Sequence, residues 1–403
     1  MPINLAGGLI WLAITASILP PGYPAYVGAY IALGASLLAL LVYGWRGRSV
    51  LAHPTSLAIV TAVTLVSVTV PFVYKSSQDL LGPMLILPMF VAIALGALSA
   101  SARAVPPATV FALICLAGSF IGFAGGAYEH YVLGVQRAGL GNNPIHYGSM
   151  IAMIGCLAIV GVAASQSPWR ILFFLGPVFA FGAAGVSGSR GALAGTLAMA
   201  AAGTIVLTFW YWRQPVFRLI VLGAACIAAA ALFYLAGSGD FRALDILANG
   251  ANIFRITGGP DDIRAALYIS ALEALKSSPV VGIGLGQIMI PAETMFGGLV
   301  VGRNLENLHA DWANFAAMAG SLGLVAWILL LLAPLLLLTD RKGRRDRTTV
   351  LAAVLLTTGQ AVLGVSNATF GILPQTLIYA VALGYFLLRA RQLPDTTAAQ
   401  QFL

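Results

Sequence analysis

Apolar segments long enough to cross a lipid bilayer follow one another along most of this chain, and this pattern limits its fold more than any other feature. The 403 residues are 60% hydrophobic and 8% charged, whereas a soluble domain has about 25% charged residues. A membrane-spanning helix needs about 20 mostly apolar residues. Because backbone groups in lipid must pair within their own segment, these spans are expected to be helices. The sequence therefore predicts an all-α integral membrane protein.

Twelve spans are expected, separated by short breaks rich in proline, glycine and charge. They cover residues 5–19, 24–44, 55–74, 81–100, 107–126, 145–164, 169–186, 191–212, 218–236, 309–338, 348–368 and 372–389. One long stretch, 237–308, cannot cross a bilayer. The predicted divisions are therefore 1–236 with nine spans, the loop 237–308, and 309–403 with three spans and a cytoplasmic tail.

The basic residues of the short loops predict the orientation, because lysine and arginine accumulate on the cytoplasmic side of membrane proteins. If the amino terminus is cytoplasmic, that side receives thirteen of the 21 basic residues and three acids, and the other side receives eight basic and ten acidic residues. Both termini are therefore expected in the cytoplasm. The net charge of +8 follows from this topology, so the expected partners include membrane lipids and exclude nucleic acid.

Two short outward segments carry arginines. Arg137 lies between spans five and six, in a loop that ends in Asn143-Pro144. Asn143 is expected either to cap the next helix, with proline in its first turn, or to contact a substrate. Arg190 lies in a very short turn between spans seven and eight, at or near membrane depth, where ionisable groups usually face a protein interior or an aqueous cavity. Arginine at a helix N-terminus suits an anion, and a side chain that extends to the interface is the alternative.

The long loop 237–308 is expected to contain one amphipathic helix, at about residues 261–276. Proline and acids mark its start, and apolar residues recur at every fourth position. Arg264 and Tyr268 share a second stripe of this helix. The glycines from 282 to 286 do not form a dinucleotide fingerprint, because no strand precedes them. They are expected to form a flexible turn that returns the chain toward the membrane.

The end of this loop brings further polar groups to the start of span ten. Arg303 precedes it, and His309 and Trp312 lie at the expected boundary between water and lipid. A single histidine at such a boundary is either structural or functional, and its position after a segment rich in cations favours function. Glu306 is the candidate to orient the imidazole if the chain folds back.

Several guanidinium groups and one imidazole narrow the possible chemistry. The chain has no HExxH, P-loop or GxSxG motif, and its outer acids are scattered, so no metal site is expected. Arginine binds phosphate oxygens through two hydrogen bonds and keeps its charge, while an imidazole accepts a proton near neutral pH. Together they suit transfer of a group from a membrane-anchored diphosphate, with the arginines stabilising the charge of the leaving group.

These segments resemble, in order and topology, the O-antigen ligase and O-antigen polymerase superfamily of bacterial inner membranes. The resemblance rests on SGSRG at 187–191, on Arg264 followed by SSPVVGIGLGQ, on NLHADW at 307–312, on Arg137-Ala138-Gly139 before Asn143-Pro144, and on the twelve-span layout. One departure concerns the acceptor: family members often have asparagine after the histidine and tyrosine or leucine shortly beyond, where this chain has Ala310 and Trp312.

The resemblance implies a GT-C-like helical glycosyltransferase that needs no metal or cofactor and takes its glycan from undecaprenyl diphosphate. Arg190 and Arg264 match the diphosphate-binding arginines of the family, Arg137 matches a third, and His309 matches the catalytic histidine. Further substrate contacts are expected from four residues: Asn143, Tyr268, Arg303 and Trp312.

Within the superfamily the single long outer loop favours the ligase, which transfers O-antigen to a sugar hydroxyl of lipid A-core oligosaccharide on the periplasmic side, with inversion and with His309 as general base. A polymerase or a protein O-oligosaccharyltransferase is the alternative within the superfamily. A transporter of lipid-linked sugars or anions is the alternative from another class; such proteins often contain internal repeats and broken helices at mid-membrane.

Overall fold

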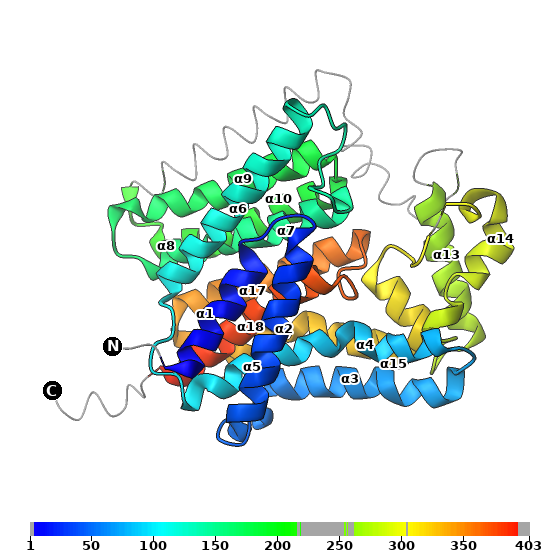
Figure 1. The fold of residues 1–403 in the computed structure, drawn as a ribbon, viewed down its shortest axis with the longest axis horizontal. Helices are drawn as coiled ribbons and strands as arrows, with labels where there is room; N and C mark the ends of the chain where they lie inside the picture. Colours follow the sequence, from blue (N-terminus) through cyan, green and yellow to red (C-terminus); the bar gives the residue numbers. More distant parts are fainter. Residues whose placement is uncertain are drawn as a thin grey trace.

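The structure is a computed structural model that describes residues 4–215, 218, 254, 256, 262–303 and 305–393. Every regular element in these residues is a helix, and they contain no strand (Figure 1). Ten helical segments of this part are long and apolar enough to cross a membrane. The prediction of an all-α integral membrane protein is therefore confirmed.

In the described residues, nine α-helices are each the only α-helix of one expected span, and the others share a span or lie in the loops. The first group comprises α1 (Leu5–Ile18), α2 (Pro24–Tyr43), α3 (Pro54–Val73), α6 (Ala108–Tyr131), α9 (Leu175–Ser187), α10 (Arg190–Tyr211), α15 (Asp311–Leu332), α17 (Arg347–Ser366) and α18 (Leu373–Gln392). The second comprises α4 (Leu81–Ile86), α5 (Phe90–Ala97), α7 (Pro144–Leu157), α8 (Val160–Ala164), α13 (Asp262–Ser277), α14 (Ile290–Val300) and α16 (Arg341–Arg345).

These bounds lie within a few residues of the expected spans, with three differences. The first span is a helix of 14 residues, shorter than a full crossing. The expected span 218–236 lies, apart from Arg218, outside the described residues. The tenth span begins at Asp311 and not at His309, because Ala310 has extended backbone angles and serves as the N-cap.

The helices form two groups joined by a central pair. Helices α6, α7, α9 and α10 pack on one another, and α3 packs along α15 on the opposite side of the molecule (Figure 1). Between the two groups, α17 contacts both α10 and α15, and α18 contacts both α5 and α7. Helix α18 is buried along nearly its whole length, so it forms the centre of the core.

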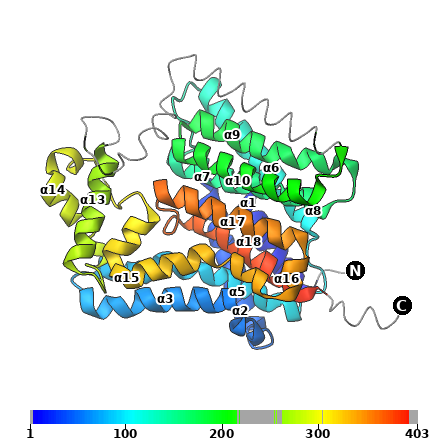
Figure 2. The ribbon, with the colours of Figure 1, turned by 180° about the vertical axis from the view of Figure 1, so that it is seen from behind.

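The segments that the charge pattern assigns to the cytoplasm lie together in the structure. Three hydrogen bonds join them: Asn4 Nδ2 donates to Ser101 O (2.7 Å), Arg391 Nη2 to Ser49 Oγ (2.6 Å) and Arg170 Nη2 to Gln214 Oε1 (2.6 Å). Helix α1 begins and α18 ends here, on the side of the molecule away from α13 and α14 (Figure 2).

The segments assigned to the outer side meet at the other end. Here too three hydrogen bonds link separate loops: Tyr23 N donates to Leu140 O (2.9 Å), Ala138 N to Val186 O (3.0 Å) and Gly286 N to Asp79 Oδ1 (2.8 Å). Loops expected on the same side of the membrane therefore contact one another, as the predicted order of spans requires.

Helix α15 is broken at Ala319 and Gly320, whose backbone angles are not helical. The segment 279–284 passes this break and pairs with the backbone groups that it frees. Ile283 N donates to Ala317 O at 2.8 Å, and Ser321 N donates to Pro279 O at 2.8 Å. Since an unpaired backbone group inside a membrane costs several kcal/mol, this segment makes the broken helix compatible with a membrane interior.

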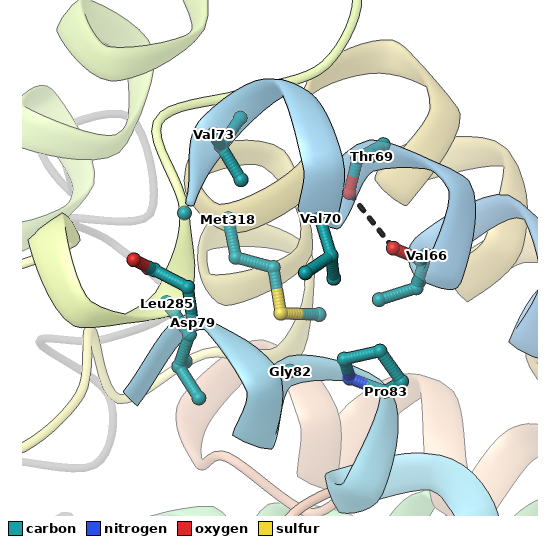
Figure 3. Close-up of a pocket in the computed structure, with 10 residues that line it drawn as sticks. Val66, Thr69, Val70, Val73, Asp79, Gly82, Pro83, Leu285 and Met318 are labelled. Atoms are coloured by element: carbon teal, nitrogen blue, oxygen red, sulfur yellow. Dashed lines mark hydrogen bonds between the residues drawn. The ribbon is translucent and has the colours of Figure 1, made fainter. Parts of the chain in front are cut away.

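The glycine-rich segment is therefore a fixed contact and not the flexible turn expected from the sequence. A Cβ atom on Gly282 would lie 2.5 Å from Ala319 N, and the φ of Gly282 is +72°. Both facts require glycine there. Beside this contact lies a small cavity into which Met318 points, with Asp79 at its edge and apolar residues of α3 along its wall (Figure 3).

Candidate functional site

Arg190 is the first residue of α10, at a tight turn that follows α9. Gly188 ends α9 in the left-handed conformation, and Ser189 caps α10 by accepting a hydrogen bond from Ala192 N at 3.3 Å. Arg190 is partly buried. Gly188 and Ser189 of the SGSRG segment therefore have structural roles, because they end α9 and start α10 within two residues.

The loop that carries Arg137 docks on this turn. Arg137 Nε donates to Ser187 O at 3.0 Å, and Ala138 N donates to Val186 O at 3.0 Å. The loop is held from its other side by Glu129, whose Oε2 accepts hydrogen bonds from the next two backbone N–H groups, at 2.7 Å each. The exposed Arg137 is therefore held beside the turn that positions Arg190.

Asn143 and the start of α7 pack against the same turn. Asn143 Oδ1 accepts from Ile145 N at 2.9 Å and caps α7, with Pro144 in the first turn. A Cβ atom on Gly148 would lie 2.7 Å from Ser187 Oγ and 3.3 Å from Ser189 Cβ. Of the two roles expected for Asn143, helix capping is the one seen in the structure.

The end of α17 and the residues after it, 365–371, connect the elements that carry the expected site residues. Gly191, next to Arg190, packs so closely on Ser366 that a Cβ atom there would overlap the serine hydroxyl. Tyr268 of α13 donates from its hydroxyl to Val365 O at 2.8 Å. Asp311, the first residue of α15, accepts hydrogen bonds from Thr369 Oγ1 and Phe370 N. Three helix segments far apart in sequence therefore converge on segment 365–371.

Tyr268 and Trp312 lie in one aromatic cluster. Their ring centroids are 5.4 Å apart, and the ring of Phe254 lies 6.3 Å from the first and 6.4 Å from the second. Tyr268 is buried, whereas Trp312 is partly exposed. Arg264 lies one helical turn before Tyr268, on the same side of α13. The cluster therefore fixes α13 against the start of α15 and brings Arg264 toward His309.

His309 has a backbone conformation that few residues other than glycine adopt. Its φ is +52°, a conformation that persists only where the surroundings hold it. Here His309 N donates to Asn307 Oδ1 and Leu308 N donates to Asn314 Oδ1, both at 2.9 Å. Such backbone strain is often found at functional sites.

The surroundings of the imidazole favour its neutral form. Burial lowers the pKa of His309, and the positive charge of Arg264 lowers that pKa further. The imidazole is thus uncharged at neutral pH and able to accept a proton.

His146, in the first turn of α7, is a residue that the sequence interpretation missed. It lies close enough to His309 for the two rings to interact electrostatically. The available signal was its position three residues after Asn143, on the helix whose start was already suspected. Nothing in the sequence indicated an electrostatic interaction between the first turn of α7 and the residue before the N-cap of α15.

Two other expected contributors are not brought into this group. Arg303 is exposed, in a turn after α14. Glu306 is exposed as well, and the charge that acts on the imidazole of His309 is that of Arg264. The orientation of His309 by Glu306 therefore stays a prediction, and the backbone around His309 is bound by Asn307 and Asn314.

The arrangement offers cationic hydrogen-bond donors and a neutral base. Among the residues that the structure describes, no group of three His, Cys, Asp or Glu side chains is placed to hold a metal ion. Guanidinium groups bind phosphate oxygens, and a neutral imidazole beside them accepts a proton from a hydroxyl. The geometry is thus suited to a reaction in which an anionic group leaves and a hydroxyl attacks.

A comparison with protein families gives an independent result. Residues 175–328 match the family model described as Wzy_C, O-antigen ligase. A search of curated proteins found no match. The family match confirms the predicted resemblance to the O-antigen ligase and polymerase superfamily, whose members are glycosyltransferase-like enzymes acting on lipid-linked glycans. The matched range contains Arg190, Arg264 and His309, whereas Arg137 and Asn143 precede it.

Proposed function

We propose that this protein is an O-antigen ligase, which transfers O-antigen glycan from undecaprenyl diphosphate to a sugar hydroxyl of lipid A-core oligosaccharide. The observation that carries this proposal is the convergence of the family-matched residues. Arg190 starts α10 beside segment 365–371, and α13, which bears Arg264, is bound to the same segment through Tyr268. His309 precedes α15, which is bound there through Asp311.

In this reaction His309 acts as the general base. The oxygen of an acceptor hydroxyl attacks the anomeric carbon of the donor glycan, and its proton passes to the imidazole of His309. The bond between the anomeric carbon and the diphosphate oxygen breaks, and its electron pair remains on the diphosphate. A single displacement of this kind inverts the configuration at the anomeric carbon. The lowered pKa of His309 supports this role, because the ring is neutral before the reaction.

The arginines bind the diphosphate and stabilise the charge that it gains as the bond breaks. Arg190 and Arg264 contact it directly, and Arg137, held beside the Arg190 turn, is the third cation. Trp312 and the adjoining Tyr268 provide an aromatic face for a sugar ring. Arg303 and Asn143 are proposed to contact the glycan further from the reacting carbon.

The site faces the periplasm in this proposal, and both termini lie in the cytoplasm of a bacterium, with the protein in the inner membrane as a GT-C-like enzyme. The clustering of the outer loops at one end and the inner loops at the other supports this arrangement. Residues 237–308 then form the periplasmic loop, in which α13 lies at Asp262–Ser277, one residue from the helix expected at 261–276.

A reconstituted reaction tests the proposal. Purified protein in vesicles is supplied with undecaprenyl-diphosphate-linked O-antigen and lipid A-core oligosaccharide, with and without a chelator. The expected result is glycosylated lipid A-core in both samples for the wild type and none for His309→Ala. Longer lipid-linked glycan would indicate a polymerase, glycosylated peptide a protein O-oligosaccharyltransferase, and movement of the donor without a new glycosidic bond a transporter.

A further inference from the structure

Asp311 has a fully buried carboxyl group that the proposed reaction does not use. The residue is 0% exposed. Oδ1 accepts a hydrogen bond from Phe370 N at 3.0 Å, and Oδ2 accepts from Gln360 Nε2 at 3.2 Å and from Thr369 Oγ1. Each of these donors belongs to α17 or to segment 365–371, so one carboxylate joins the start of α15 to both.

The side chain of Asp311 packs closely on α17. A Cβ atom on Gly364 would lie 2.5 Å from Asp311 Oδ2, so a larger residue at position 364 would displace the carboxyl group. Thr369, which donates to the carboxylate, is itself fixed because its carbonyl accepts from Thr376 Oγ1 at 3.1 Å. Thr369, which donates to the Asp311 side chain, is therefore itself held in place by a hydrogen bond.

A carboxyl group inside an apolar helix bundle costs free energy that an apolar side chain of similar size would not. Ionisable residues in such positions mark functional regions more often than structural ones. One residue, Ala310, separates Asp311 from the proposed base along the chain. The stretch between them is short and extended, because Ala310 has φ −153° and ψ 138°.

The strained backbone at His309 depends on the same helix start. Asn314, in the first turn of α15, accepts from Leu308 N, and its own N–H donates to Ala310 O at 3.0 Å. The residues on both sides of His309 are therefore attached to the first turn of α15. That turn is attached to α17 and segment 365–371 through Asp311.

We propose that Asp311 is a positioning residue for His309. By fixing the start of α15 against segment 365–371, its carboxylate sets the place of the imidazole relative to Arg264 on α13, which is bound to the same segment through Tyr268. Asp311 does not touch the substrate. This inference rests on the proposed function, since it assigns Asp311 to the transfer step in which His309 accepts the proton.

The central experiment measures kcat and the KM for the lipid-linked donor in two full-length variants, Asp311→Leu and Asp311→Asn. Leucine has a similar size but accepts no hydrogen bond. Because misplacing a reacting group by about 1 Å can cost about 100-fold in rate, kcat is expected to fall about 100-fold. KM should change little, since Arg190 and Arg264 keep their places. Asparagine can accept from Phe370 N and donate to Thr369 Oγ1, so it should restore most of kcat.

Two further variants keep the test informative if Asp311→Leu does not fold. Thr369→Val removes one donor to the carboxylate and should give a smaller loss of kcat in the same direction. Tyr385→Phe is the matched control: it removes a buried hydrogen bond of 2.8 Å, to Pro106 O in an expected cytoplasmic loop. This control should lower stability without changing kcat.

A second readout needs no enzymatic activity. Carbethoxylation of histidines by diethyl pyrocarbonate, followed by mass spectrometry, reports how accessible the His309 ring is. Its rate should rise several-fold in Asp311→Leu and stay at the wild-type value in Asp311→Asn, with His130 as internal reference. Unchanged kcat and unchanged labelling in Asp311→Leu would overturn the positioning role. A wild type that makes no glycosidic bond would contradict the proposed function alone, while the labelling would still decide the role of Asp311.

Discussion

The charged residues at the two ends of the molecule have different surroundings. At the end where the termini lie, Asp346 and Arg389 form an ion pair at 3.1 Å, and Thr348 and Thr349 donate to the same carboxylate. At the other end, burial and the positive charge of Arg264 lower the pKa of His309. The first arrangement is neutralised within the protein, whereas in the proposed function the diphosphate of the donor neutralises the second.

Arginines at the first end also make cation–π contacts with aromatic rings. The guanidinium of Arg48 lies 4.6 Å from the centre of the Trp45 ring, and that of Arg170 lies 4.8 Å from the Tyr211 ring. Cations and aromatic rings together are typical of the boundary between lipid and water. In the proposed function the basic residues of this chain therefore have two roles, anchoring at one end and diphosphate binding at the other.

The largest effect is expected from His309→Ala. Removing a general base typically costs about 100- to 10,000-fold in rate, so transfer of glycan to lipid A-core should fall into that range while donor binding persists. Rates of product formation with saturating donor provide the measurement. A variant that retained more than about half of the wild-type rate would remove the imidazole from the mechanism.

Arg190→Lys tests the difference between the two ends of the molecule, because it keeps the positive charge but removes the bidentate hydrogen bonding of the guanidinium group. Loss of one donor that stabilises a developing charge costs about 100-fold in kcat, and a loss of that order is expected here. The matched control at the other end is Arg170→Lys, for which wild-type turnover is expected. Equal rates for the two variants would contradict the assignment of separate roles to the two ends.

The coupling of Arg264 to His309 predicts a change in pH dependence for Arg264→Gln. Transfer needs neutral His309, so the rate is lost as the pH falls through the pKa of this residue. Burial and then the charge of Arg264 lower that pKa. Without the arginine the pKa rises, and the acidic limb of the rate profile should move to higher pH. The pH at which the acidic limb lies does not depend on the overall loss of rate. An unchanged limb would show that the charge of Arg264 does not act on His309.

The smallest effect on transfer is expected at the end with the ion pair. Burial raises the pKa of Asp346, but the hydrogen bond from Thr348 and the charge of Arg389 together bring it below its ordinary value. A lowered pKa in the folded state stabilises the protein above the unfolded-state pKa, and this contribution is lost as the pH falls through the folded-state pKa. Asp346→Asn should lower the free energy of unfolding by about 1–3 kcal/mol. It should also weaken the dependence of stability on acidic pH and leave kcat unchanged.

The spans were predictable because hydrophobicity and breaks rich in proline and glycine mark them directly. The ends of α2, α3, α10 and α17 lie within one or two residues of the expected positions. Local helix caps were predictable for the same reason, as at Asn143. These features depend on a few neighbouring residues, and such information is present in any single sequence.

Features that depend on distant contacts were not predictable. The break in α15 exists because the segment 279–284 supplies hydrogen bonds to it, and no local pattern indicates that pairing. Likewise, the hydrogen-bond partners of Asp311 are Gln360, Thr369 and Phe370, which lie 49 to 59 residues further along the chain.

The most direct test of the central claim is a structure of the protein with undecaprenyl diphosphate bound. The account predicts that the diphosphate lies at the end where α10, α13 and α15 meet segment 365–371, in contact with the guanidinium groups of Arg190 and Arg264. His309 should lie on the side where the glycan was attached. A diphosphate bound among the arginines of α16 and α18, or one out of contact with both Arg190 and Arg264, would contradict it.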